Sequence, residues 1–116
     1  MIWKNSIPQP PVPQILRETL KDYPEIIQDI QDELNDVVMS PLSGTPIIEQ
    51  AIWAVERIFT VRFSDAFEVL KNAEQAGDSQ AIYRAKIKVD AVSRARHLWD
   101  LEDLREYFQI YKRVSE

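Results

Sequence analysis

Residues 48–99 read IEQAIWAVERIFTVRFSDAFEVLKNAEQAGDSQAIYRAKIKVDAVSRARHLW, and this stretch decides the fold. On each side of Gly77, positions recur at alternating spacings of three and four residues, and nearly all of them are apolar. Before the glycine they are Ile48, Ile52, Val55, Phe59, Arg62, Ala66, Val69 and Ala73, and after it Ile82, Ala85, Val89, Val92, Arg96 and Trp99. This spacing is typical of helices that pack lengthwise. It predicts an antiparallel hairpin of two long helices, at about 46–76 and 79–98.

Local signals at the ends of these helices agree with the hairpin. Thr45 is a suitable cap for the first helix, and Asp78 or Ser79 for the second. Gly77 suits the left-handed residue that often ends a helix. The segment 58–63 is rich in β-branched and aromatic residues, which would also suit a strand. Because the apolar phase continues through it unbroken, we favour a continuous helix.

Three further helices complete a predicted helical bundle, so the fold class is all-α. A short helix at about 14–22 leads into a second at about 23–39, and the last helix covers about 101–113. Asp22, followed three residues later by Glu25, has the pattern of a capping box at the start of the second helix.

The beginning of the chain is rich in proline, with four prolines between residues 8 and 13. Proline fixes φ and removes a backbone donor, which favours an extended conformation over a helix. We therefore expect an extended proline-rich arm over 1–13 and a single all-helical domain over 14–116. The arm either packs on its own subunit or serves as a ligand for a groove on another protein.

Composition excludes several classes of function. The 116 residues are 45% apolar and 28% charged, as in ordinary globular domains. The chain has no cysteine, which excludes disulfides, thiolate nucleophiles and cysteine-held metals. Neither a signal peptide nor an apolar run of membrane-spanning length is present. We therefore expect a cytoplasmic protein that does not enter a membrane, and we expect no cofactor.

Charge is unevenly distributed along the chain, whose net charge is −5. Residues 17–36 hold seven acidic and two basic side chains, whereas residues 80–98 hold five basic and one acidic. We expect the two segments to attract each other, within one subunit or across a dimer. The basic side chains of the second segment point in several directions around the helix. Because phosphate backbones bind a single basic face, nucleic-acid binding is disfavoured.

One acidic face is a candidate metal site. Its four carboxylates are spaced three and four residues apart on the 23–39 helix, and they are Asp29, Asp32, Glu33 and Asp36. Carboxylates in this arrangement hold Mg²⁺ when a second carboxylate helix faces them, and the sequence offers no such helix. A solvated face is the favoured interpretation, and a metal-dependent nucleotide hydrolase is the alternative.

Arg62 and Arg96 occupy positions in the hairpin stripes where apolar residues are expected. A guanidinium group is costly to bury unless it is paired. The two side chains either extend past the helix edge into water, or pair with a carboxylate in an interface, or bind an anion.

Several apolar side chains fall outside the hairpin seam and are candidates for binding a partner. Tyr83, Ile87 and Leu98, with Ala91 beside them, give the second hairpin helix an extra apolar strip. A helix that is apolar on two sides needs two neighbours. We expect the second neighbour to be the 23–39 helix or another copy of the chain. Trp53, on the polar side of its helix, contacts either a partner or the proline-rich arm.

These features favour a non-enzymatic helical protein–protein interaction module, such as a small adaptor, regulator or inhibitor. The uncovered apolar surface leads us to expect a homodimer. The candidate partner-binding residues are Trp53, Tyr83, Ile87, Leu98, Arg62 and Arg96.

Overall fold

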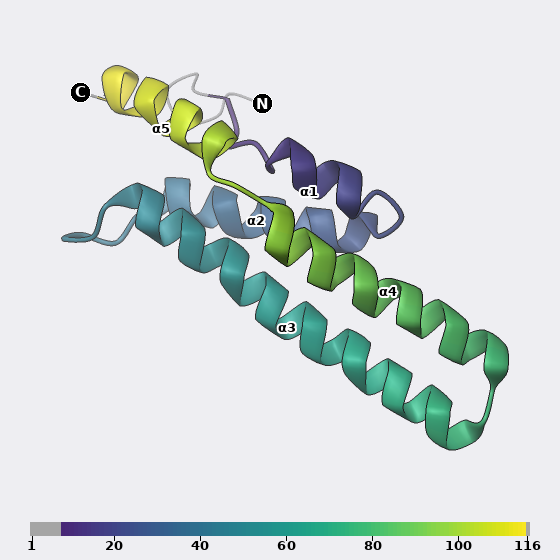
Figure 1. Ribbon diagram of the computed structural model, residues 1–116. Helices are drawn as coiled ribbons and strands as arrows, with labels where there is room; N and C mark the ends of the chain where they lie inside the picture. Colours follow the sequence, from purple (N-terminus) through teal and green to yellow (C-terminus); the bar gives the residue numbers. More distant parts are fainter. Residues whose placement is uncertain (1–7, 116) are drawn as a thin grey trace.

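The computed structural model describes residues 8–115 of the chain, and their side chains as far as residue 110. The described residues form five helices and no strand (Figure 1). In chain order these are α1 (Gln14–Thr19), α2 (Pro24–Met39), α3 (Ile47–Ala76), α4 (Ser79–Leu98) and α5 (Glu102–Ser115). The all-α prediction is confirmed. None of these helices is both long and apolar enough to cross a membrane.

The predicted hairpin is present, with α3 and α4 packed side by side. Gly77 ends α3 in the left-handed region, at φ 70°, and its N–H donates to the carbonyl groups of Ala73 and Glu74. Asp78 then caps α4 by accepting hydrogen bonds from two backbone amides of the first turn. The segment 58–63 is helical, as the unbroken apolar phase predicts.

Two predicted helix caps differ from those observed. The cap positions of α2 and α3 are occupied by Tyr23 and Pro46, and neither supplies a side-chain hydrogen bond. Asp22 and Thr45 lie one residue too early to act as caps, so these two predictions were wrong. Pro24 occupies the first position of α2, where its missing N–H leaves one amide fewer in need of a cap.

The helices around the hairpin are not arranged as predicted. α2 lies along α3, whereas α1 packs against α4, and α5 contacts α3. The second neighbour of α4 is therefore the short helix α1 rather than the acidic helix α2. Ala91 and Ala95 of α4 are buried, and such small side chains let a helix approach closely.

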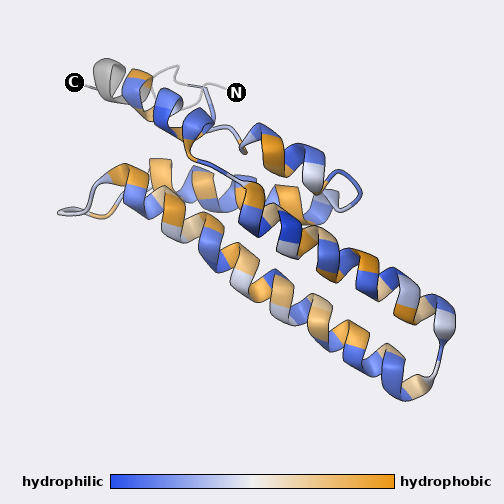
Figure 2. Cartoon of the chain, in the orientation of Figure 1, coloured by the Kyte–Doolittle hydropathy of each residue, from blue (hydrophilic) through white to orange (hydrophobic). Residues whose placement is uncertain are grey.

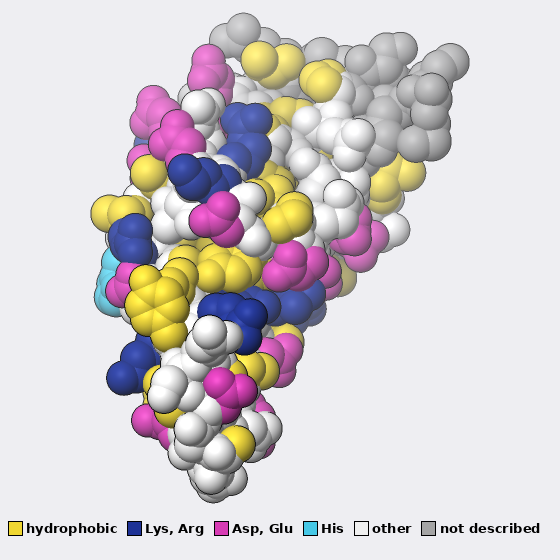
Figure 3. Space-filling view, turned by 90° about the vertical axis from the view of Figure 1, so that its right-hand side faces the viewer, with side chains coloured by type: hydrophobic (Ala, Val, Ile, Leu, Met, Phe, Trp, Pro, Cys, Tyr) yellow, Lys and Arg dark blue, Asp and Glu magenta, His cyan; other side chains and the backbone are white. Residues whose placement is uncertain are grey.

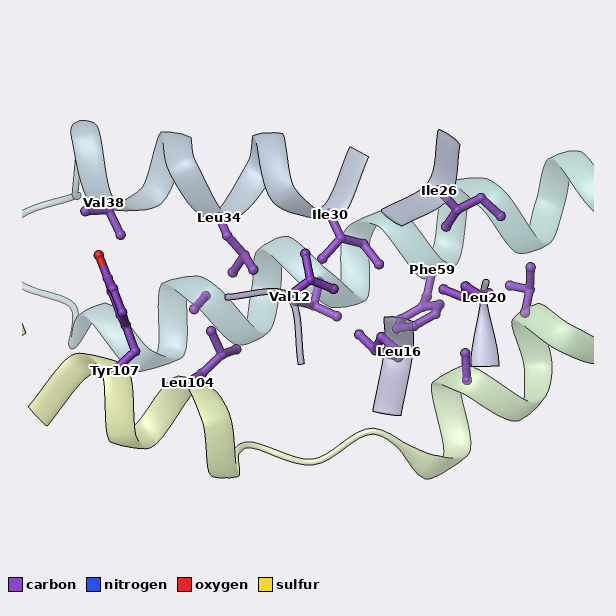
Figure 4. Packing of buried hydrophobic residues seen from close by; sticks show 14 of the residues in the cluster. Val12, Leu16, Leu20, Ile26, Ile30, Leu34, Val38, Phe59, Leu104 and Tyr107 are labelled. Carbon is purple, nitrogen blue, oxygen red and sulfur yellow. The ribbon is translucent and has the colours of Figure 1, made fainter. Parts of the chain in front are cut away.

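The core lies where α1, α2 and α5 meet the first half of α3. Phe59 of α3 is fully buried beside Leu16 of α1 and Leu20, the residue that follows α1 (Figure 4). From α2, a stripe of fully buried side chains four residues apart faces α3, formed by Ile26, Ile30, Leu34 and Val38. α2 lies along α3 because this contact buries the whole apolar side of α2.

The described part of the proline-rich arm is built into this core. Val12 is buried and points between the helices (Figure 4). Gln31 of α2 donates a hydrogen bond to the carbonyl oxygen of Pro10 at 2.7 Å. The hydroxyl group of Tyr107 in α5 donates to the carbonyl oxygen of Pro8 at 2.8 Å. This part of the arm therefore packs on its own subunit, and the first seven residues lie outside the described residues.

The hairpin continues past the ends of α1 and α2 (Figure 1). We call this part, 65–76 of α3 and 79–89 of α4, the distal hairpin. Its buried side chains are three alanines, Ala66, Ala73 and Ala85. Figure 2 shows that hydrophobic positions nevertheless continue along both helices toward the tip. The distal hairpin thus carries apolar surface that none of the other described helices covers.

Phe59→Ala is expected to lower the free energy of unfolding by about 3–5 kcal/mol, because it removes a fully buried ring and leaves a cavity. Urea unfolding followed by circular dichroism measures this change. Phe67→Ala on the same helix is the matched control, since more than half of the Phe67 side chain is exposed, and its effect should stay below about 1 kcal/mol. Similar losses in the two variants would contradict this placement of the core.

Candidate interaction surfaces

The carboxylates on the acidic face of α2 have different partners. Asp29 accepts a hydrogen bond from Nε of Arg62 in α3 at 2.7 Å. Glu33 pairs with Arg57, which also belongs to α3. Asp32 accepts one from the glutamine a turn earlier in α2, at 2.8 Å. Within residues 8–110, no three His, Cys, Asp or Glu side chains are placed to hold a metal ion together. Two of the four carboxylates on the acidic face therefore join α2 to α3 through ion pairs.

The two arginines of the hairpin stripes both form ion pairs within the chain. Arg62 turns out of the α3–α4 seam and joins α3 to α2 through Asp29. Nε of Arg96 lies 3.5 Å from Oε2 of Glu56, which links α4 to α3. Nε1 of Trp99 donates to the other oxygen of the same carboxylate at 3.3 Å. Both arginines thus have partners in their own subunit, and each of these pairs joins two helices.

The predicted attraction between the acidic and basic segments involves few contacts. Nζ of Lys88 in α4 lies 3.5 Å from Oε1 of Glu25 in α2. This is the one ion pair between α2 and α4 among the described side chains. Two of the five carboxylates of α2 instead pair with Arg57 and Arg62, which belong to α3.

An open groove of about 400 Å³ lies between the distal hairpin and the start of α2. We call it the hairpin groove, and its walls include Tyr23, Val69, Ala81, Arg84, Ile87 and Lys88. Val69 is 57% exposed and Ile87 is 44% exposed, although both are large and apolar. Figure 3 looks onto this end of the molecule and shows hydrophobic side chains among those of Lys and Arg.

Tyr23 forms the end of the hairpin groove nearest to α2. Nζ of Lys88 lies 5.4 Å from the centre of its ring, a distance suited to a cation–π contact. Burial raises the pKa of the Tyr23 hydroxyl group, and the nearby carboxylates of Asp22 and Glu25 raise it further. The cation–π contact, together with the Glu25 ion pair, holds one basic wall of the groove in place.

The two helices of the distal hairpin carry opposite charges beside the groove. On α3, Asp65 lies one turn before Val69 and therefore on the same side of the helix. On α4, Arg84 and Lys88 are part of the groove wall. Neither Asp65 nor Arg84 forms an ion pair with another described side chain.

A separate apolar area lies on the other side of α3. Phe67 is two residues from Val69, which places it about 160° away around the helix. Its ring stacks on that of Phe63, with the ring centres 6.1 Å apart. This face is distinct from the hairpin groove.

A second groove, of about 490 Å³, lies at the opposite end of the bundle, beside the loop that joins α2 to α3. We call it the loop groove, and its walls include Glu33, Asp36, Val37, Leu42, Trp53 and Arg57. Leu42 is 65% exposed and Trp53 is 57% exposed. The described part of the arm lies against α2 and α5 instead of on Trp53. Contact of Trp53 with a partner stays a prediction.

The candidate partner-binding residues do not form a single site. Tyr83 and Ile87 are exposed on the distal hairpin, Trp53 lies in the loop groove, and Leu98 is exposed at the end of α4. Leu98 is thus separated from Tyr83 and Ile87 along α4, and Ala91 between them is buried.

Sequence reasoning missed two exposed residues of these grooves. Val69 follows the hairpin stripe, yet its side chain is exposed in the hairpin groove. Leu42 lies in a loop rich in Pro, Ser and Gly, where a lone large apolar residue was the available signal.

The ion pair between Arg62 and Asp29 is expected to contribute about 0.5–1 kcal/mol, since both side chains are only partly exposed. A double-mutant cycle with Arg62→Met and Asp29→Asn measures this coupling in urea unfolding, and we expect it to fall as salt is added. The matched control is the more exposed pair of Arg94 and Asp90 within α4, with a coupling below about 0.5 kcal/mol. Equal coupling energies for the two pairs would contradict a special role for the first.

Comparison of the chain with protein-family models, with curated proteins and with solved structures finds no match. Its function is therefore inferred below from the contacts, burial and charges of its own residues.

Proposed function

We propose that this chain is a non-enzymatic helical protein–protein interaction module that forms a homodimer through its distal hairpin. The observation that supports this most directly is the exposure of three large apolar side chains there, those of Val69, Tyr83 and Ile87. Contiguous apolar surface on a projecting element is characteristic of interaction sites. A cytoplasmic location is part of the proposal, and the absence of cysteine suits such a reducing compartment.

The energetics of the distal hairpin favour an added partner. Alanine side chains bury little apolar area, so the seam formed by Ala66, Ala73 and Ala85 contributes little to stability. A second helical surface laid over Val69 and Ile87 would remove much more apolar area from water. Dimerisation would therefore stabilise the part of the bundle that has the least core of its own.

Charge suggests how two copies would meet. In a symmetric contact about a twofold axis parallel to the hairpin, α3 of one copy lies on α4 of the other. Asp65 of each copy would then lie near Lys88 and Arg84 of its partner, so that opposite charges meet on both sides. The alternative arrangement, α3 on α3, would bring like charges together.

The two alternative functions have less support from the contacts. A metal-dependent hydrolase would need Asp29 and Glu33 as ligands, and both are engaged with arginine side chains. A nucleic-acid-binding surface would need the cations of α4, of which Lys88, Arg94 and Arg96 are paired with carboxylates.

Ile87→Asp is expected to convert the homodimer into a monomer, because it places a charge in the proposed apolar contact. Size-exclusion chromatography with light scattering, at high micromolar concentration, should give the wild type twice the 13.5 kDa mass of one chain and the variant the single mass. Phe67→Asp is the matched control on the opposite face of α3 and should stay dimeric. A monomeric wild type, or a dimer that Ile87→Asp leaves intact, would remove this interface.

Asp65→Lys is expected to weaken the dimer about tenfold at low salt, because a cation would then face Lys88 and Arg84 of the partner. The difference from the wild type should shrink at high salt, where exposed charges are screened. Glu74→Lys makes the same change of charge on the Phe67 side of α3 and should shift the dimer affinity by less than about twofold. Analytical ultracentrifugation measures all three dissociation constants, and equal shifts in the two variants would contradict the proposed orientation.

A further inference from the structure

The loop between α2 and α3 is held by a buried glutamine. Gln50 of α3 is only 5% exposed, and it is the buried polar side chain of the described core. Its Nε2 donates to the carbonyl oxygens of Leu42 at 3.0 Å and Thr45 at 2.8 Å. Its Oε1 accepts from the N–H of Leu42 at 2.8 Å. Both backbone groups of Leu42 are thus tied to one side chain.

This clamp fixes the backbone of Leu42 while its side chain remains 65% exposed. The exposed ring of Trp53 lines the same groove. Leu42 and Trp53 thus give one groove two large exposed apolar side chains. A partner that covers them benefits from the clamp, because a fixed loop conformation lowers the entropy lost on binding.

The charges of the loop groove are mainly negative. Glu33, Asp36 and Arg57 contribute to its walls, and Arg57 is paired with Glu33. Asp36 has no ion pair with another described side chain. Glu49 lies one turn before Trp53, on the same side of α3, and is exposed. The groove therefore offers apolar surface bordered by unpaired carboxylates.

We propose that the loop groove docks a basic amphipathic segment of another protein. A bulky apolar side chain of that segment packs on Trp53 and Leu42, and its Lys or Arg side chains face Asp36 and Glu49. Aromatic anchors surrounded by complementary charge are the usual centre of such contacts. This inference rests on the proposed role in protein binding but not on the homodimer, because the loop groove lies at the opposite end from the distal hairpin (Figure 1).

A second copy of the chain is a weaker candidate for the occupant. Its exposed cations on α4 would have to enter the loop groove of the next copy, and such a head-to-tail contact joins two different surfaces and does not close after two copies. Linear assemblies would then lengthen as the protein concentration rises, and light scattering would detect them.

Selection from a random peptide library displayed on phage tests the proposal. The full-length chain is the bait. A counter-selection against the double variant Trp53→Ala and Asp36→Lys removes peptides that bind to other parts of the surface. We expect the enriched peptides to carry Lys or Arg beside a bulky apolar residue. A synthetic, fluorescently labelled copy of the most enriched peptide then serves as the probe in anisotropy titrations.

Single variants should affect the affinity of this probe peptide differently. Trp53→Ala should weaken binding at least about tenfold, and Asp36→Lys about three- to tenfold at low salt, with a smaller effect at high salt. Both side chains are exposed, so circular dichroism should show both variants folded. Ile87→Asp should bind the peptide like the wild type, even where it abolishes the dimer. This variant therefore tests the loop groove separately from the proposed homodimer.

Three outcomes would overturn the proposal. The first is a selection that enriches no sequence, or enriches acidic or uncharged ones. The second is peptide binding that Trp53→Ala and Asp36→Lys leave unchanged. The third is light scattering that shows assemblies larger than a dimer which Asp36→Lys abolishes, since the occupant would then be another copy of this chain.

Discussion

The length of α3 relative to the helices that cover it is the constraint on which the structure depends. α3 has 30 residues and so extends for about 45 Å, whereas α2 has 16 residues and covers about half of that length. Where α1, α2 and α5 are present, α3 contributes large buried residues such as Phe59. Beyond them, the buried side chains between α3 and α4 are alanines, and larger ones such as Leu70 are only half-buried. Stability therefore concentrates in one half of the molecule, and exposed apolar surface in the other.

Charge pairing decides how α2 is used. The helix carries five carboxylates and no basic side chain, so its apolar stripe brings negative charge close to the bundle. Arg57 and Arg62 of α3 meet part of that charge at the edges of the seam. Asp36, which pairs with neither arginine, lines the loop groove. The same acidic helix thus joins the bundle on one side and gives the loop groove its negative border.

The two ends of the bundle consequently have different chemistry. The hairpin groove combines Val69 and Ile87 with the basic side chains of α4, and the loop groove combines Leu42 and Trp53 with carboxylates. The proposed interaction module would therefore hold two different surfaces at once, one in each groove. The clamp formed by Gln50 adds rigidity at one end, whereas the long uncovered helices provide area at the other.

The sequence by itself determined the helices and the hairpin, because helix formation, the left-handed turn at Gly77 and the repeat of apolar residues all act over a few neighbouring positions. It also identified Tyr83, Ile87 and Trp53, whose exposure the structure bears out. Only the tertiary structure decided that α1 covers α4, that Arg62 pairs with Asp29, and that Gln50 holds Leu42 in place. These contacts join positions whose approach depends on how whole helices pack, and periodicity along one helix carries no information about which neighbour it meets.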